Sequence, residues 1–219
     1  MDNDTRTARW ERHVDVPLGV ASLLYLAAYA VHVLGAGLPR PVHVLCLTVI
    51  LTTWVMFAVD YAVRWHLSGE GLRFVRRHWL DSVVVVLPLL RPVRVVRVYD
   101  AVQRRGGAAR WPLQARVMVY AGLSAVLLGF AASLVVYQVE HTAPHATIRT
   151  FGDSVWWACS TLSTVGYGDA TPVTLPGRAV AVGLMACGLA LLGAVTGSFS
   201  SYLLERFARD EYGEGPPRS

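Results

Sequence analysis

The chain has 219 residues, of which 54% are hydrophobic and 16% charged, and its mean hydropathy is +0.42. This composition is too apolar for an ordinary soluble domain. The net charge of +5 would also suit a nucleic-acid-binding protein, but the arginines cluster at the ends of apolar segments, as in membrane proteins with positively charged cytoplasmic loops. We therefore expect a multi-pass membrane protein that binds no nucleic acid.

Two apolar segments in the first third of the chain are long enough to cross a bilayer. They cover residues 14–38 and 42–65, with a tight turn at 39–41 between them. The loop after the second segment carries a cluster of arginines and is expected in the cytoplasm. Residues 1–13, which contain three arginines, should then be cytoplasmic as well.

Asp60 lies near the inner end of the second segment. A carboxylate within a spanning segment is costly unless it has a partner or contacts water. Asp60 either pairs with Arg64 at the membrane interface or acts as a countercharge for mobile arginines, and the sequence favours neither interpretation.

Residues 79–105 combine an apolar run with regularly spaced arginines. Asp81 opens the run, and Arg91, Arg94 and Arg97 recur at every third position, which on a helix gives one charged stripe along an apolar rod. Such stripes are typical of voltage sensors. Two crossings are difficult here, since about a dozen helical residues reach only ~18 Å against ~30 Å of hydrocarbon. We favour a compact sensor-like hairpin, and the alternative is an interfacial helix whose arginines bind anionic lipid phosphates.

The second half of the chain contains two further spanning segments with a short helix between them. After a linker at 106–112, residues 113–139 form the first segment and residues 177–205 the second. The second is rich in glycine, which suits close packing of helices but can also weaken a helix, and Gly188 is the candidate for a gating hinge. Between the segments lie an outer loop with two histidines and a helix at 151–163 that is too short to span a bilayer.

The string Thr164-Val165-Gly166-Tyr167-Gly168-Asp169 follows the short helix directly. Gly166 and Gly168 can adopt left-handed backbone angles at little cost, and this lets successive carbonyl groups point to one side, as they do not in an ordinary strand. Four such loops around an axis would replace the water shell of a cation with carbonyl oxygens, to which Thr164 adds its hydroxyl. A loop of this kind at membrane depth is tolerated only where it lines a water-filled path.

From residue 151 to about residue 205 the chain resembles the pore domain of tetrameric potassium channels. The resemblance rests on Trp156-Trp157, the six-residue string, residues 172–174, Gly177-Arg178 and the last glycine-rich helix. It implies a homotetramer with one central pore, in which Thr164 to Gly168 form the selectivity filter. The permeant potassium ion would be bound by Thr164, Val165, Gly166 and Tyr167.

The same resemblance implies roles for the residues around the filter. Asp169 would form a hydrogen bond with Trp157 behind the filter, and Tyr167 would pack into the same aromatic cuff, together with Trp156. Gly188 falls at the hinge position of the inner helix of these channels.

The first half of the chain resembles prokaryotic six-helix voltage-gated channels more loosely. Asp60 and Asp81 are similar to the acids of their second and third helices, and Arg91, Arg94 and Arg97 are similar to the gating charges of their fourth helix. The region that would hold the third and fourth helices is much shorter here than in those channels.

The sequence thus predicts an all-α membrane protein in which a voltage-sensor-like helical domain (14–105) precedes a two-helix pore domain (113–205) with a re-entrant pore helix and a selectivity filter. We expect a homotetrameric potassium channel of a bacterial inner membrane, modulated by voltage, with cytoplasmic segments at 1–13 and 206–219. Two alternatives stay open: a potassium channel gated by lipid, pH or tension, and a non-conducting regulatory subunit.

Ions cross such a pore passively, so we expect no enzymatic activity, no catalytic residues and no organic cofactor. The histidines are scattered along the chain, and their spacing predicts no metal site other than the potassium-binding filter.

Overall fold

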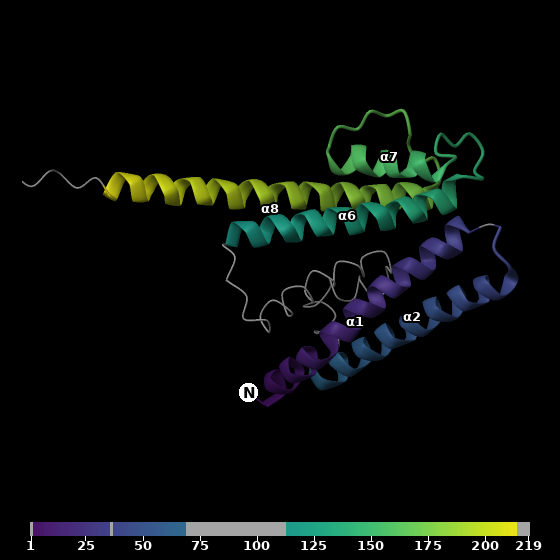
Figure 1. Cartoon of the computed structure of the whole chain (residues 1–219), viewed down its shortest axis with the longest axis horizontal. Helices are drawn as coiled ribbons and strands as arrows, with labels where there is room; N and C mark the ends of the chain where they lie inside the picture. Colours follow the sequence, from purple (N-terminus) through teal and green to yellow (C-terminus); the bar gives the residue numbers. More distant parts are fainter. Residues whose placement is uncertain (1, 36, 69–112, 214–219) are drawn as a thin grey trace, which may run out of the picture.

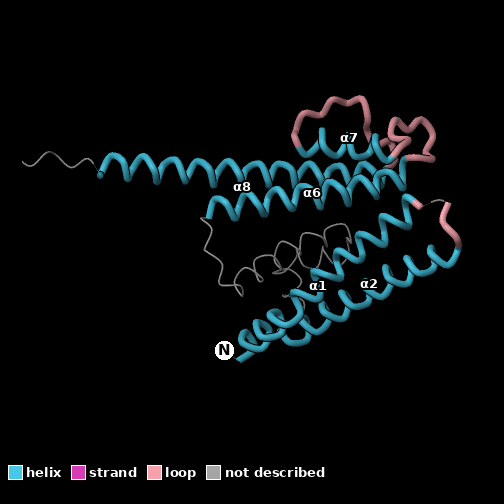
Figure 2. Tube along the Cα trace, in the orientation of Figure 1, coloured by secondary structure: helices cyan, strands magenta, loops and turns pink. Residues whose placement is uncertain are grey.

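Figure 1 presents the computed structural model of the chain, which describes residues 2–35, 37–68 and 113–213. These ranges contain helices and loops and no strand, so the prediction of an all-α protein is confirmed (Figure 2). The described helices are α1 (Asp2–Leu34), α2 (Arg40–Ser68), α6 (Leu113–Glu140), α7 (Phe151–Leu162) and α8 (Leu175–Gly213). The linker at 106–112 and the predicted sensor residues Asp81, Arg91, Arg94 and Arg97 lie outside the described residues.

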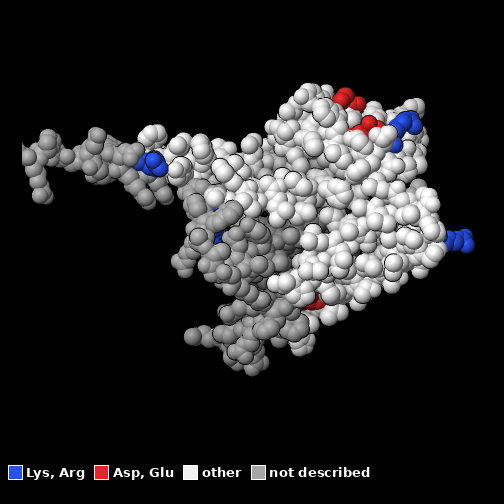
Figure 3. Space-filling model, viewed as in Figure 1, with Lys and Arg blue, Asp and Glu red and all other residues white. Residues whose placement is uncertain are grey.

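Four of these helices are long and apolar enough to cross a membrane. Their spanning stretches are Val16–Leu34, Arg40–Val63, Ala115–Glu140 and Leu175–Leu204, with mean hydropathies between 1.7 and 2.2. Less than half of each stretch is buried within the chain, so the remaining apolar surface faces outward. Among the described residues, few charged side chains appear on the face seen in Figure 3. Surfaces of this kind suit hydrocarbon, and the chain is a multi-pass membrane protein.

The helices form two packed units (Figure 1). α1 and α2 make a hairpin, in which Leu18 and Ala21 of α1 pack against Phe57 of α2. α6 and α8 run side by side, and the short helix α7 packs against both of them.

The two units meet along α1 and α6. Leu26 of α1 packs against Ala131 and Leu134 of α6 in a buried cluster. One turn further along α1, the hydroxyl of Tyr29 donates a hydrogen bond to the side-chain oxygen of Gln138. The C-terminal end of α1 therefore lies beside the C-terminal end of α6.

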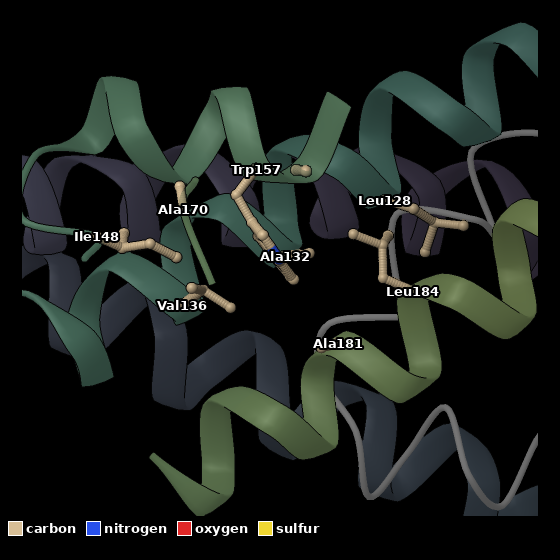
Figure 4. Packing of buried hydrophobic residues seen from close by; sticks show 9 residues of the cluster. Leu128, Ala132, Val136, Ile148, Trp157, Ala170, Ala181 and Leu184 are labelled. Atoms are coloured by element: carbon tan, nitrogen blue, oxygen red, sulfur yellow. The ribbon is translucent and has the colours of Figure 1, made fainter. Parts of the chain in front are cut away.

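The position of α7 is fixed by one large aromatic side chain (Figure 4). Trp157 is only 3% exposed and points from α7 into the cluster that α6 and α8 form. Small residues such as Ala132 and Ala181 line this cluster and allow the backbones to approach closely enough for the indole to fill the space between them. α7 is thus held rigidly against the two long helices.

The helix bounds agree with the predicted ones for α6 and α7 and differ for α1, α2 and α8. α6 and α7 end within one residue of the prediction, whereas α8 continues to Gly213 instead of ending at residue 205. α1 extends back to Asp2, so helix covers most of the segment predicted as a polar terminus. α2 starts at Arg40, inside the predicted turn. Pro41 fits the first helical turn, because the amide that proline lacks would have no partner within the helix at that position.

Candidate functional site

The start of α7 is fixed by a reciprocal cap. The Thr150 hydroxyl accepts a hydrogen bond from the Asp153 amide (3.1 Å), and the Asp153 carboxylate accepts one from the Thr150 amide (2.8 Å). The Arg149 amide donates a third bond to the same carboxylate (3.1 Å). These bonds, first the one from the Thr150 backbone and then the one from Arg149, hold the pKa of Asp153 below its ordinary value. These local hydrogen bonds fix the first residue of α7 and stabilise its N-terminal turn.

The loop after α7 turns back onto the end of the helix. The carbonyl oxygen of Ser160 accepts hydrogen bonds from the amides of Val165 (3.0 Å) and Gly166 (3.1 Å). Within the described residues, the carbonyl oxygens of 164–167 accept no hydrogen bond. The end of α7 thus binds the first amides of the loop, and the loop carbonyls are available to a ligand.

The backbone of the loop alternates between two conformations. Thr164, Gly166 and Gly168 have φ angles of 60°, 58° and 78°, whereas Val165 and Tyr167 are not left-handed. A left-handed residue at every second position turns successive peptide groups so that their carbonyls can share one side. The glycines behave as predicted. The left-handed Thr164 was not foreseen, because a β-branched residue rarely adopts this strained conformation.

The aromatic support of the loop differs from the prediction in one residue. Asp169 was expected to bond to Trp157, but its Oδ2 accepts the hydrogen bond from the indole nitrogen of Trp156 (2.9 Å). The Trp156 ring also stacks on Tyr167, with centroids 5.3 Å apart and planes at 11°. Trp157 faces a different side of α7, toward the core described above. Adjacent helical residues point about 100° apart, so only one of the two indoles can face the returning loop.

The buried carboxyl group of Glu140, a residue expected in the outer loop, anchors the segment that follows the loop. Glu140 is fully buried at the end of α6, where its carboxyl oxygens accept hydrogen bonds from the amides of Val173 (2.9 Å) and Thr174 (3.0 Å) and from the Thr174 hydroxyl (2.6 Å). Gly177 leaves the space for it, since a Cβ there would meet the carboxyl oxygen. The sequence offered one signal for this buried acid, namely its position at the end of an apolar helix. An acid at that position is equally typical of the membrane interface, so the signal did not predict burial.

The hinge candidate Gly188 lies at a close contact within the described helices. A Cβ on Gly188 would lie 3.3 Å from the carbonyl oxygen of Leu162, the last residue of α7. Gly193 and Gly197, further along α8, have open space at the same position. Gly188 therefore permits close packing of α8 against the end of α7, a role that is separate from the proposed hinge.

Of the predicted sensor residues, only Asp60 lies in the described part of the chain. It is buried in α2, 3% exposed, one turn after the equally buried Phe57.

The loop is exposed in the single chain. Val165 is 55% exposed and Tyr167 is 64% exposed, and all residues from Ser163 to Asp169 are exposed. Exposed apolar side chains that gather on one loop are typical of surfaces that contact further protein.

In comparisons with known proteins, residues 124–205 match the model of the ion-channel family. The chain is 35% identical over 80 residues to the calcium-gated potassium channel TvoK of Thermoplasma volcanium, which is 36% of this chain and 22% of that protein. It is 36% identical over 66 residues to a voltage-gated potassium channel of Aeropyrum pernix (30% of this chain, 22% of that protein). A longer match, 30% identical over 173 residues, is to the human voltage-gated potassium channel regulatory subunit KCNG1 (76% of this chain, 33% of that protein).

These similarities confirm the resemblance to voltage-gated-like potassium channels. The chain spans between about one fifth and one third of the length of these three relatives.

Proposed function

Because residues 124–205 match the ion-channel family and the chain resembles voltage-gated-like potassium channels, we propose that it is a subunit of a potassium-selective channel that conducts passively. The loop from Thr164 to Gly168 carries this proposal. The amides of its first three residues are bound to the end of α7, its carbonyls at 164–167 accept no hydrogen bond from the described residues, and its backbone alternates as required for a row of carbonyl ligands.

In this proposal the carbonyl oxygens of Thr164, Val165, Gly166 and Tyr167, with the Thr164 hydroxyl, replace the water shell of potassium. Several ions in a row repel one another, and this repulsion offsets tight binding and allows rapid passage. The C-terminal end of α7 adds a partial negative charge next to the loop, which favours cations over anions. No covalent step is involved.

The proposed assembly is a homotetramer. Its support is the exposure of Val165, Tyr167 and much of α8 in the single chain, which three further copies would cover. Trp156 stacked on Tyr167 would then form part of an aromatic layer around the filter.

We further propose that the α1–α2 hairpin belongs to a domain that responds to voltage. The buried Asp60 in α2 supports this, because a protected acid can serve as countercharge for arginines such as Arg91, Arg94 and Arg97, with Asp81 as a second acid. The linker at 106–112 would transmit their movement to the pore, with Gly188 as the hinge. The arginine clusters would lie at the cytoplasmic surface near anionic lipids, with both ends of the chain on that side of a bacterial inner membrane.

A flux measurement on reconstituted protein tests the conducting role. Vesicles loaded with potassium chloride and holding the purified chain should release potassium, and vesicles loaded with sodium chloride should not. The similarity to KCNG1 makes a regulatory subunit the second candidate. A folded tetramer that releases neither ion would favour that candidate and contradict the channel proposal.

The voltage response has its own test. Replacing Arg94 and Arg97 together by glutamine should flatten the dependence of conductance on voltage and leave potassium selectivity unchanged. A curve that keeps its slope in the double variant would favour the alternative of a channel gated by lipid, pH or tension.

A further inference from the structure

Two histidines that are 11 positions apart in the sequence meet at the turn between α1 and α2. His32 lies in the last turn of α1 and His43 in the first turn of α2. Their Nδ1 atoms are 3.3 Å apart, and the rings are nearly perpendicular, with centroids separated by 5.3 Å. Both side chains are partly exposed, so solutes can reach the pair.

The distance between the two nitrogens matches the spacing of metal ligands. Two nitrogens bound to a tetrahedral Zn²⁺ at ~2.0–2.1 Å lie about 3.3–3.4 Å apart. Without a metal, one ring donates an Nδ1–H hydrogen bond to the Nδ1 of the other, and a bound ion would take the place of that proton between the two nitrogens. We infer that His32 and His43 form a binding site for a first-row divalent transition-metal ion such as Zn²⁺, with both Nδ1 atoms as ligands.

The site has two protein ligands, and water completes the coordination. Within the described ranges no group of three or more histidine, cysteine, aspartate or glutamate side chains could hold a metal ion. Closed structural zinc sites have four protein ligands, so an ion at this pair exchanges with the solution. Imidazole selects Zn²⁺, Cu²⁺ or Ni²⁺ over Mg²⁺ and Ca²⁺, which prefer oxygen ligands.

The pair faces the same side of the membrane as the loop at the end of α6. Tyr29, one turn before His32, contacts Gln138 in the last turn of α6. The loop that leads from α6 to α7 begins just after Gln138. In the topology proposed above this side is extracellular. A bound ion would join the ends of α1 and α2 across their connecting turn and hold the hairpin closed at this end.

Zinc titration calorimetry on the purified full-length chain tests the site. We expect one saturable Zn²⁺ site per chain, weakened at least about tenfold by either His32→Asn or His43→Asn. The matched control is His66→Asn, at the exposed opposite end of α2, which should bind like the wild type. Excess Mg²⁺ should not compete. Circular dichroism and gel filtration of each variant check that the fold is kept.

A second measurement does not depend on any variant being folded. Cu²⁺ bound to the wild-type chain should give an electron paramagnetic resonance spectrum with coupling to two imidazole nitrogens. The inference is overturned if wild-type Zn²⁺ binding is not saturable, if both His32→Asn and His43→Asn bind as tightly as wild type, or if the copper signal lacks this coupling. None of these readouts measures current, so they stand or fall separately from the channel proposal.

Discussion

Glu140 and Thr174, which are 34 positions apart, are joined by two hydrogen bonds: the Thr174 amide and hydroxyl both donate to Oε1 of the glutamate, at 3.0 Å and 2.6 Å. Through these two bonds the end of α6 holds the segment that leads from the loop at 164–169 into α8. The loop is therefore fixed at both ends, by Ser160 at its start and by Glu140 beyond its end.

Replacing Glu140 by glutamine should destabilise the fold. Glutamine offers one oxygen where the carboxyl group offers two, so at least one partly buried donor of Val173 or Thr174 loses its partner, at a cost of about 1–3 kcal/mol per chain. Thermal unfolding of the purified protein measures the effect. Thr174→Ser, which keeps the hydroxyl, is the control and should unfold near the wild-type temperature. Equal temperatures for Glu140→Gln and wild type would show that the clamp contributes nothing.

Gly166→Ala should abolish selective conduction. Its φ of 58° is left-handed, and a side chain in that conformation costs roughly 1–2 kcal/mol, so the loop would relax and its carbonyls would turn away. Gly183→Ala is the matched control, because Gly183 lies in α8 with open space around it and has no left-handed angle. Potassium and sodium flux from vesicles compares the two. Selective flux through Gly166→Ala would contradict the role assigned to this loop.

The two adjacent tryptophans should respond differently to substitution by phenylalanine. Trp156→Phe removes the hydrogen bond to Asp169 beside the loop. If potassium binds the loop as proposed, it should raise the melting temperature more than sodium does, and Trp156→Phe should reduce this difference. Trp157→Phe leaves a space in the core and should lower stability in both salts by about 1–2 kcal/mol, less than the ~3–5 kcal/mol of a truncation to alanine. Melting curves in the two salts separate these outcomes, and the reverse pattern would restore the role first predicted for Trp157.

Gly188→Ala and Gly193→Ala should change stability in opposite directions. Alanine is favoured over glycine inside a helix by about 1 kcal/mol, and Gly193 has room for the added methyl group. At Gly188 the methyl group would press on the Leu162 carbonyl at 3.3 Å and force α8 away from α7. Thermal unfolding measures both variants. If Gly188→Ala is as stable as Gly193→Ala, the packing role fails and the hinge remains as the proposed reason for this glycine.

The cap at Asp153 should add a defined acid dependence to stability. Its pKa is lowered from the ordinary value of 3.8, so the unfolded chain binds the proton more readily than the folded one. The stabilisation is complete above the ordinary value and is lost as the pH falls through the lowered one. The stability difference between wild type and Asp153→Asn should thus stay constant from neutral pH to about pH 5 and shrink below about pH 4. A difference that is unchanged at the lowest pH would contradict the assigned cause.

The sequence predicted the bounds of α7 and the left-handed glycines at 166 and 168, because both depend on local signals. The cap of Thr150 and Asp153 that fixes the first residue of α7 is also local, although it was not used in the prediction. These features depend on neighbouring residues alone, so no tertiary information was needed.

The features that were missed depend on contacts between distant segments. Which tryptophan faces Asp169 is decided by the path of the returning loop, since both occupy the same helix. The burial of Glu140 requires the segment at 173–174 to pass over the end of α6, and the His32–His43 pair requires α2 to start at residue 40. A sequence pattern does not contain this information.

The reversal potential of the purified chain in a planar bilayer tests the central claim most directly. With potassium on one side and sodium on the other, we expect a current that reverses near the potassium equilibrium potential and shifts by about 59 mV for each tenfold change in the potassium gradient. A current that reverses near zero under the same gradient, and does not follow potassium, would contradict the assignment of Thr164 to Gly168 as a potassium-selective filter.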